Sequence, residues 1–387
     1  MENRPYSEDC LPLKDVLCRE YAVRECCGER RDALNQATRL LSQPEDIQTS
    51  LSRDQLSEAV SLLSEGRNAV QYDQDGYPSI MVHIPTLYQS DLIKDGDPHA
   101  LHPAFVEGQS KIWVGKYQSS DLNGHACSLP MGKPIYSVNY DEAQRLCSQK
   151  GSGWSLTPFA LRMAIALFCR RNGFLPHGNN VNGHDFFHPE EKGIPVGNGQ
   201  TLCGSGPATW THDGTPNGLC DLNGNLNEWD IGLRLLDGEI QFIPMNVLLQ
   251  ANVDLGLNSP LWQALDETGA FVPPGMTGTL KYDAPDGHIR LTRTCEYPGI
   301  GNCAFADLQI EANLEPPQIA KLLGLYPESD RSGYGLGWRW ISTYGEVLPL
   351  CGGGFRADDH AGVFFVGATY PRTKDYNLTG FRVCYHD

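Results

Sequence analysis

Residues 218–229 read GLCDLNGNLNEW, and this stretch is the most informative about the fold. Asp, Asn and Gly dominate it, and these residues favour tight turns because their small or short polar side chains tolerate unusual backbone angles. Trp229, the last residue of the stretch, is large and apolar, so we expect its side chain to pack into the core. An EF-hand loop is excluded, because Gly232 stands where a bidentate Glu would be required. We therefore expect a shaped turn that leads into the core.

Patterned stretches lie on both sides of this turn. Before it come KIWVGKY at 111–117, PIYSVNYDEA at 134–143 and WSLTP at 154–158. After it come GGGF at 352–355 and GFRVC at 380–384. Alternating apolar residues predict strands over 80–84 and 112–117. The final stretch from Gly335 to Asp387 is expected to consist of strands and loops.

Two helices are expected between the first strands and the turn. Asn139, with a Glu three positions on, predicts a capped helix start, and Gly151 predicts the end of that helix. Thr157 followed by Pro158 predicts a second start, and Gly173 predicts its end. The 41 Gly and 26 Pro of the 387-residue chain favour a loop-rich fold over a helical bundle.

Taken in order, these stretches resemble the formylglycine-generating-enzyme (sulfatase-modifying factor) domain, a divergent C-type-lectin-like fold. The helix start, the GN-x-x-EW element and the terminal GFR of that family are present. The resemblance covers roughly residues 80–387, apart from a long insertion at about 233–334 that contains few periodic runs. It implies an α+β, loop-rich domain, and it does not by itself imply a function.

The oxidase branch of this family holds copper with two cysteines shortly after its glycine element, since thiolates suit Cu(I). The matching positions are Ala357 and Gly362, which cannot bind a metal, while Cys351 and Cys384 lie elsewhere. The iron-dependent sulfoxide-synthase branch requires histidines on an added helical domain, and residues 1–78 contain none. We therefore predict no catalytic residues, and an enzyme of the formylglycine-generating class remains the alternative.

Residues 351–382 read CGGGFRADDHAGVFFVGATYPRTKDYNLTGFR. This segment resembles the variable region of proteins diversified by retroelements, such as phage tropism determinants on tail fibres. In that group a fixed frame holds the fold while the positions between change. The frame here would be Gly352, Gly353, Ala361, Gly362, Val363, Phe364, Pro371, Arg372, Gly380, Phe381 and Arg382. The implied ligand-binding positions are Phe355, Arg356, Asp358, Asp359, His360, Phe365, Thr369, Tyr370, Lys374, Asp375 and Tyr376.

These interleaved residues are suited to recognition. Aromatic side chains give rigid contact area at low entropy cost, and mixed polar groups give adaptable hydrogen bonds. The alternative is that they are ordinary loop residues over a strand pair. We predict a non-enzymatic phage tail-fibre adhesin, and a bacterial surface adhesin of the same fold is a further alternative.

The resemblance also implies one metal site, because the turn of the enzyme family binds calcium through side chains and backbone carbonyls. The matching groups are the side chains of Asp221 and Glu228 and the carbonyls of Gly224 and Leu226, and hard oxygen ligands suit calcium. The alternative is a turn that only shapes the core. No cofactor is required by the predicted function, and calcium is the only one implied.

Two other sets of ligand-type residues carry no predicted site. The 13 cysteines are scattered without a CxxC pair, so we expect mostly reduced, buried thiols. The only local histidine cluster matches no zinc pattern and lies in a Gly- and Asn-rich loop, so we expect solvated loop residues there. Its members are His177, His184, Asp185 and His188.

Residues 1–78 differ from the rest and predict a helical attachment or oligomerisation region before a binding domain at 79–387. One helix is expected from Lys14 to Leu41. A second is expected from Ser52 to Gly66, with a stripe of leucines and a valine. Neither helix can bury much surface alone, so we expect a homo-oligomer, for which a trimer is one option.

The net charge of -17 repels nucleic-acid phosphate and anionic lipid, so neither is an expected partner. No stretch approaches the ~18 apolar residues that span a bilayer. The N-terminus has neither the positive start nor the apolar run of a signal peptide. We expect a virion protein of the phage tail, assembled in the host cytoplasm. Its expected partners are tail or baseplate proteins and a host cell-surface protein or glycan.

Overall fold

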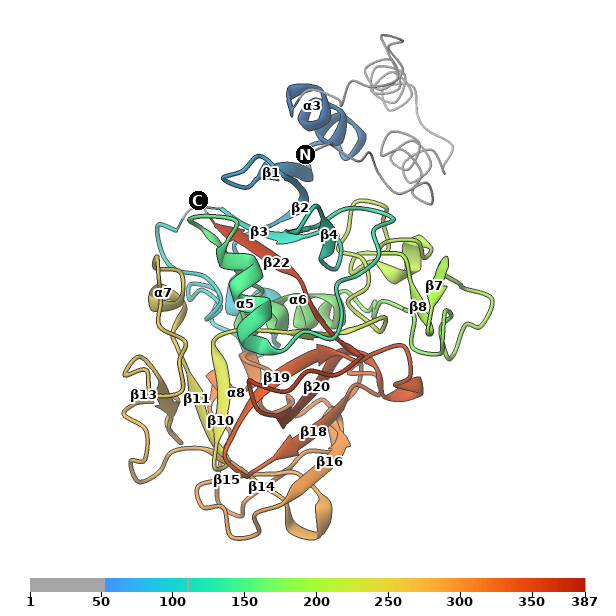
Figure 1. The fold of residues 1–387 in the computed structure, drawn as a ribbon. Helices are drawn as coiled ribbons and strands as arrows, with labels where there is room; N and C mark the ends of the chain where they lie inside the picture. The colour runs from blue at the N-terminus through green and yellow to red at the C-terminus, as the bar shows by residue number, and fades with distance from the viewer. Residues whose placement is uncertain (1–52, 110, 387) are drawn as a thin grey trace.

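The computed structural model in Figure 1 describes residues 53–109 and 111–386. The fold is mixed α+β, with more strand than helix and with a curled main sheet. The helix expected from Lys14 to Leu41 lies outside the described residues. Across the described ranges, no helix is long and apolar enough to cross a membrane.

A five-stranded antiparallel sheet joins the two ends of the described chain. Its order is β1-β2-β3-β22-β6. The strands are β1 (Asn68–Tyr72), β2 (Pro78–Ile84), β3 (Ile112–Gly115), β22 (Val383–His386) and β6 (Trp154–Leu156). Cys384 of β22 pairs with Val114 on one side and with Ser155 on the other, so the last strand lies inside the sheet. The strands predicted over 80–84 and 112–117 are confirmed, although β3 ends at Gly115.

A thirteen-stranded sheet forms the larger body of the protein (Figure 1). Its main path is β16-β18-β20-β19-β10-β11-β14-β15-β17, with β9, β12, β13 and β21 attached beside it. The strands are β9 (Asn227–Trp229), β10 (Leu233–Leu236), β11 (Glu239–Phe242), β12 (Gln263–Leu265), β13 (Phe271–Val272), β14 (Lys281–Asp283), β15 (Arg290–Thr292), β16 (Ile300–Ala304), β17 (Gln309–Ile310), β18 (Trp338–Ser342), β19 (Glu346–Gly352), β20 (Gly362–Tyr370) and β21 (Thr379–Phe381).

The segment expected as an insertion, 233–334, supplies strands β10 to β17 of this sheet. Leu235 of β10 pairs with Val347 of β19, so the segment continues the sheet that carries the C-terminal strands. Its strands have five residues or fewer, which is too short for a clear alternating pattern in the sequence.

Two helices, α5 (Tyr140–Ser148) and α6 (Phe159–Arg171), lie between the two sheets in Figure 1. Side chains of β3, α6 and β20 line one small interior cavity, so α6 contacts both sheets. Asn139 caps α5 as predicted, because its side chain accepts a hydrogen bond from the Glu142 backbone at 2.9 Å. The prediction that Thr157 caps α6 is wrong, because the cap residue is Pro158. The Thr157 hydroxyl instead donates to the Arg382 carbonyl.

The N-terminal helix α3 (Arg53–Leu63) confirms the second helix expected in the first 78 residues. Its buried residues pack with the side chains of Ile80 and Tyr117 in a small second core. Pro78 pairs with Tyr72 in the β1–β2 hairpin, so the boundary expected at residue 78 cuts through a hairpin of the small sheet. The correction places the end of the helical region before β1.

The remaining described elements are short. They are α4 (Gln89–Leu92), α7 (Met245–Leu248), α8 (Gln318–Leu322), the 3-10 turns η1 (Ala208–Trp210), η2 (Pro285–Gly287), η3 (Phe305–Asp307) and η4 (Asp358–His360), and the hairpin strands β4 (Ser120–Leu122), β5 (His125–Cys127), β7 (Pro195–Gly197) and β8 (Gln200–Thr201). The core lies around α6 and the large sheet. Trp229 packs there as predicted, fully buried and edge-on to Tyr140 at 6.0 Å between ring centroids.

Candidate functional site

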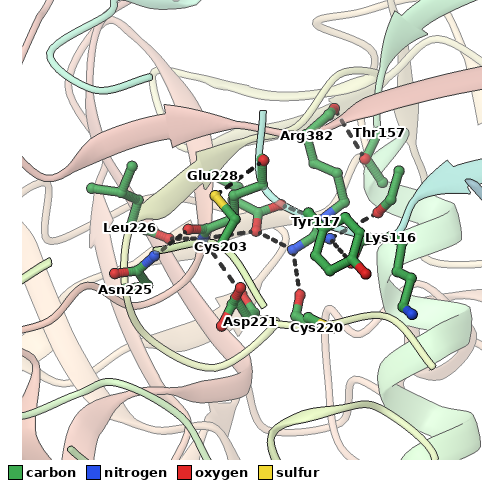
Figure 2. Close-up of polar contacts among 12 residues, drawn as sticks. Lys116, Tyr117, Thr157, Cys203, Cys220, Asp221, Asn225, Leu226, Glu228 and Arg382 are labelled. Carbon is green, nitrogen blue, oxygen red and sulfur yellow. Dashed lines mark hydrogen bonds and ion pairs between the residues drawn. The ribbon is translucent and has the colours of Figure 1, made fainter. Parts of the chain in front are cut away.

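A network of buried charges lies where the 218–229 turn meets the terminal GFR (Figure 2). Figure 2 shows the Arg382 guanidinium and the Glu228 carboxylate pointing toward one another, and Arg382 Nη2 donates to Glu228 Oε1 at 2.9 Å. Arg162 of α6 donates from Nη2 to Glu228 Oε2 at 2.5 Å. Arg382 also donates to the carbonyl of Cys220 at 2.7 Å. The network therefore ties α6, β9 and the end of the chain together.

The charges of this network compensate one another out of water. Burial alone would raise the pKa of Glu228, but the charges and hydrogen bonds of Arg162 and Arg382 lower it to about 2. Asp230 pairs with Arg162 at 2.7 Å between Oδ2 and Nε, yet burial raises its pKa because the guanidinium is shared with Glu228. Removing one member of such a network leaves a buried charge without its partner, which is strongly destabilising.

The calcium site implied by the sequence is not formed by these residues. The side-chain amide of Gln118 occupies its place, since Nε2 donates to Glu228 Oε1 at 3.0 Å and to the Leu226 carbonyl at 3.1 Å. The same nitrogen lies 3.4 Å from the Asp221 carbonyl, and the Asp221 carboxylate accepts from the Gly204 backbone at 2.7 Å. The Glu228 carboxylate already accepts from an amide and two guanidiniums, so it does not fit a cation. The calcium prediction is therefore corrected to a turn held by Gln118. Three of the four expected ligand residues, Asp221, Leu226 and Glu228, accept the hydrogen bonds described above. The fourth, Gly224, is not among their acceptors.

The frame positions of 351–382 are mostly interior. All of them are buried except Gly362, Pro371 and Arg372. A side chain on Gly353, which has a φ of +80°, would place its Cβ 2.8 Å from the Cβ of Ala361. A side chain on Gly380 would place its Cβ 2.8 Å from the backbone oxygen of Ile135. Glycine is therefore required at both places.

Arg372 links the segment to the rest of the fold although it is only half-buried. Its Nε lies 2.7 Å from Glu346 Oε2 of β19, and its Nη1 lies 3.0 Å from Asp141 Oδ1 of α5. Its carbonyl accepts from the Tyr140 backbone at 3.1 Å. Pro371 is exposed, and nothing in the structure explains its place in the frame.

The expected ligand-binding positions fall into two groups around the ends of β20. In the first group, Arg356 and Asp358 are exposed, and Asp359 and His360 are half-buried. The His360 ring lies edge-on to Trp338, with 4.3 Å between centroids. This group follows β19 and forms the turn that precedes β20.

The second group comprises the last two residues of β20 and the loop after it. Thr369 and Tyr370 are half-buried, and Lys374, Asp375 and Tyr376 are exposed. The rings of Tyr370 and Tyr376 lie 6.1 Å apart. The chain then returns to Leu378, whose Cβ lies 3.5 Å from the position of a Cβ built on Gly354 beside the first group. The structure thus places nine of the eleven predicted positions at least partly in solvent, in two groups.

The prediction of ligand-binding side chains is wrong for Phe355 and Phe365, because both are buried and neither presents its ring to solvent. Phe355 is 1% exposed and lies beneath a loop that is distant in sequence, where a Cβ on Gly199 would meet its ring at 2.5 Å. The Asn182 backbone donates to the Phe355 carbonyl at 2.7 Å. Phe365 is 9% exposed on β20, with its ring beside Gly367. Both phenyl rings avoid water, and both are therefore packing residues.

Several exposed aromatic residues near these groups were not predicted. Trp340 of β18 is 37% exposed and pairs with Gly367 of β20, and Trp338 lies two residues before it against His360. The alternation Trp-Arg-Trp, with Arg339 buried, is a signal that could have placed both indoles on the outer face of a strand. Exposed aromatics of this kind mark contact surfaces when they gather beside polar residues.

The cysteines of the described ranges lie mostly in the interior. None of the nine cysteines in the described ranges forms a disulfide with another of them, and Cys295 is the only one of the nine that is not buried. Burial raises the pKa of Cys384 to about 12 and raises the pKa of Cys351 well above its usual value. The expectation of reduced, buried thiols is confirmed for these residues.

The structure brings together three of the four residues in the histidine cluster. Ligand atoms of His177, Asp185 and His188 all lie within 4.8 Å of one another. His184 does not join them, and its Nδ1 instead lies 3.0 Å from the Asp185 carbonyl. The expectation of solvated loop residues is wrong for Asp185, which is 2% exposed, and only half right for the two histidines, which are half-buried.

No known family model matches the chain, and no curated protein matches it. The resemblances drawn from the sequence therefore stay predictions. What the chain does has to be argued from its own residues and their arrangement.

Proposed function

We propose that this chain is a non-enzymatic receptor-binding protein with a C-type-lectin-like domain, whose segment 351–382 contacts a molecule on a host-cell surface. The observation that carries the proposal is the division within that one segment. Most of its glycines and apolar residues are buried, as is Arg382, while nine of the eleven positions between them are at least partly in solvent. A surface built this way can change its side chains without changing its fold.

The exposed positions have the composition of a contact surface. Tyr376 and Trp340 supply aromatic area that is already partly ordered by neighbouring rings. Lys374 and Asp375 form no side-chain hydrogen bond or ion pair with any described residue, so both remain free for a ligand. Anchors of this type dominate binding energy at protein surfaces, while surrounding polar residues adapt to the partner.

The proposal extends to the setting of the protein. Diversification of the exposed positions by a retroelement would give one fold many ligands. The helical region before β1 would attach the domain to tail or baseplate proteins and join copies, so that weak single sites gain avidity. The target is a protein or glycan of the host surface, the location is a phage tail, and no metal or organic cofactor takes part in the contact surface itself. A bacterial surface adhesin would use the same surface.

A cell-binding measurement tests the proposal. Fluorescently labelled protein is titrated onto a panel of bacterial strains, with Tyr376→Ala compared with the wild type on any strain that is bound. The matched control is Tyr88→Ala, because the two tyrosines are 41% and 42% exposed and Tyr88 lies outside the segment. We expect Tyr376→Ala to weaken binding about tenfold or more, as for a hot-spot residue, and Tyr88→Ala to leave it unchanged.

Two outcomes would contradict the proposal. One is equal binding by the wild type and by a variant with Arg356, Lys374 and Tyr376 all changed to alanine. The other is turnover of a cysteine-containing peptide by copper-loaded protein, which would favour the oxidase of the formylglycine-generating class.

A further inference from the structure

We propose that His177, Asp185 and His188 bind a divalent first-row transition-metal ion, for which zinc fits best. We further propose that the ion stiffens the loop that supports the 355–360 turn. The metal site stands independently of the proposed function. Only its effect on recognition rests on that function.

The three side chains already converge. One ligand atom from each lies within 4.8 Å of the other two. The His177 and His188 rings are stacked, with 4.0 Å between centroids and 9° between planes. The lone pairs of an imidazole lie in its ring plane, so one of these parallel rings must rotate for both to face the same ion.

A carboxylate orients the first histidine. Glu191 Oε2 lies 3.0 Å from His177 Nδ1, so the other ring nitrogen stays free for an ion. The same oxygen accepts from Thr209 Oγ1 at 2.8 Å and from Trp210 Nε1 at 3.0 Å, which fixes it in place. Metal-binding histidines commonly have such a carboxylate on the second nitrogen. Glu190 stands in a looser relation to His188, with 3.7 Å between Oε1 and Nδ1.

The carboxylate of Asp185 is held in a defined orientation beside the two rings. Its Oδ1 accepts from the backbones of Phe187 and His188 at 2.9 Å and 3.0 Å. Its Oδ2 accepts from the Gly178 backbone at 3.0 Å and from the Asn180 side chain at 3.4 Å, and an ion would replace the longer of these two bonds. The side chain is 2% exposed, and a positive ion would offset its buried charge.

This donor set selects the class of metal. Two imidazoles and one carboxylate suit zinc, nickel, cobalt and ferrous iron, whereas calcium and magnesium prefer oxygen alone. Three protein ligands leave at least one position open, as in zinc sites that bind water or a further ligand. The expected occupant is therefore a zinc ion with an exchangeable position.

The loop that carries the ligands is tied to the proposed contact surface. Asn180 donates from its side chain toward Asp185 Oδ2 at 3.4 Å, and its carbonyl accepts from the Asp358 backbone at 3.1 Å. Asn182 donates to the Phe355 carbonyl. An ion on Asp185 would therefore restrict the backbone that supports the 355–358 turn. It would also restrict the backbone at Phe187, which donates to Asp185 and whose ring is 60% exposed.

The first test measures metal binding by the full chain. The protein is stripped with a chelator, dialysed and titrated with zinc by calorimetry, and bound zinc is counted by mass spectrometry. We expect one zinc per chain that is lost in the double variant His177→Gln/His188→Gln and retained in the matched control His99→Gln, a change of an exposed histidine elsewhere. Glu191→Gln, at the positioning residue, should weaken zinc affinity about 10- to 100-fold. Equal zinc binding by the wild type and the double variant overturns the site.

Cobalt substitution separates this site from the thiols. Cobalt held by two imidazoles and a carboxylate shows ligand-field bands without the intense charge-transfer band of a thiolate ligand. Such a spectrum supports the proposal, and a thiolate band in the wild type that persists in the double variant overturns it.

Amide exchange tests the coupling. Zinc should slow exchange at the Asp358 amide in the wild type and have no effect in the double variant. Unchanged exchange in zinc-loaded wild type would overturn the coupling and leave the metal site in place. If the protein binds zinc and zinc slows amide exchange, but the protein binds no cell surface, the result would count against the proposed function alone.

Discussion

The buried network and the exposed positions of 351–382 use charge in opposite ways, although the same segment contributes to both. Arg382 lies in the interior with its guanidinium shared between Glu228 and three backbone carbonyls. Arg356 and Lys374 lie in solvent, where water compensates their charges. A buried charge fixes its surroundings because any change leaves a partner unpaired. An exposed charge can be exchanged at little cost. The segment can therefore be rigid and variable at once.

The largest expected effect is at the centre of the network. Glu228→Gln leaves the Arg382 guanidinium without a carboxylate and leaves Arg162 with Asp230 alone, and we expect a loss of about 3–5 kcal/mol in the free energy of unfolding. Urea unfolding measures it. Glu190→Gln is the matched control, since the Glu190 side chain is 73% exposed, and it should change stability by less than about 0.5 kcal/mol. Equal stability of the two variants would mean that the network does not hold the fold.

Phe355 was expected among the exposed positions of 351–382, but it lies among the buried ones. Phe355→Ala removes a ring that is 1% exposed, and we expect a loss of about 3 kcal/mol. Tyr376→Ala, in the same segment and 41% exposed, should cost less than about 1 kcal/mol. Thermal unfolding of both variants in parallel measures the difference. A stable Phe355→Ala protein that loses ligand binding would return Phe355 to the contact surface.

Acid should weaken the network. The folded pKa of Glu228, about 2, lies below its ordinary value of 4.5, so its contribution to stability is complete above pH 4.5 and is lost as the pH falls toward 2. This contribution is at most about 3 kcal/mol. The raised pKa of Asp230 acts in the opposite direction and reduces the total. Unfolding measured from pH 5 to 2 should show falling stability in the wild type and a flatter profile in Glu228→Gln. An identical slope in both would assign the acid sensitivity to other groups.

The smallest effect is expected on the exposed side. A variant with Arg356, Lys374 and Asp375 all changed to alanine should keep its stability to within about 0.5 kcal/mol per site, because these side chains are in solvent. Chemical unfolding checks this result. A loss comparable to that of Glu228→Gln would show that the exposed positions also carry the fold and are not free to vary.

The sequence predicted those parts of the fold that depend on local chemistry. The Asn139 cap, the strand over 80–84 and the buried Trp229 each follow from residues that are close together in the chain. The short strands of 233–334 could not be predicted, because no single strand is long enough to show a period and pairing alone defines them.

The two errors at the site have one physical cause, which is contact between residues distant in sequence. Phe355 is covered by the loop at Asn182 and Gly199, more than 150 positions earlier in the numbering. The oxygens expected around calcium are bonded by Gln118, which lies 110 positions before Glu228. Neither contact leaves a pattern in the nearby sequence. The sequence was therefore consistent with an exposed Phe355 and with a calcium site in the 218–229 turn.

Sequencing many natural copies of this coding region would show whether only the exposed positions of 351–382 vary. We predict substitutions at the exposed positions Arg356, Asp358, Asp359, His360, Thr369, Tyr370, Lys374, Asp375 and Tyr376. We predict constant residues at Gly353, Gly380 and Arg382, and apolar residues at Phe355 and Phe365, because these five are buried. An invariant 354–378 stretch, or substitutions as frequent at the buried frame as at the exposed positions, would contradict the account.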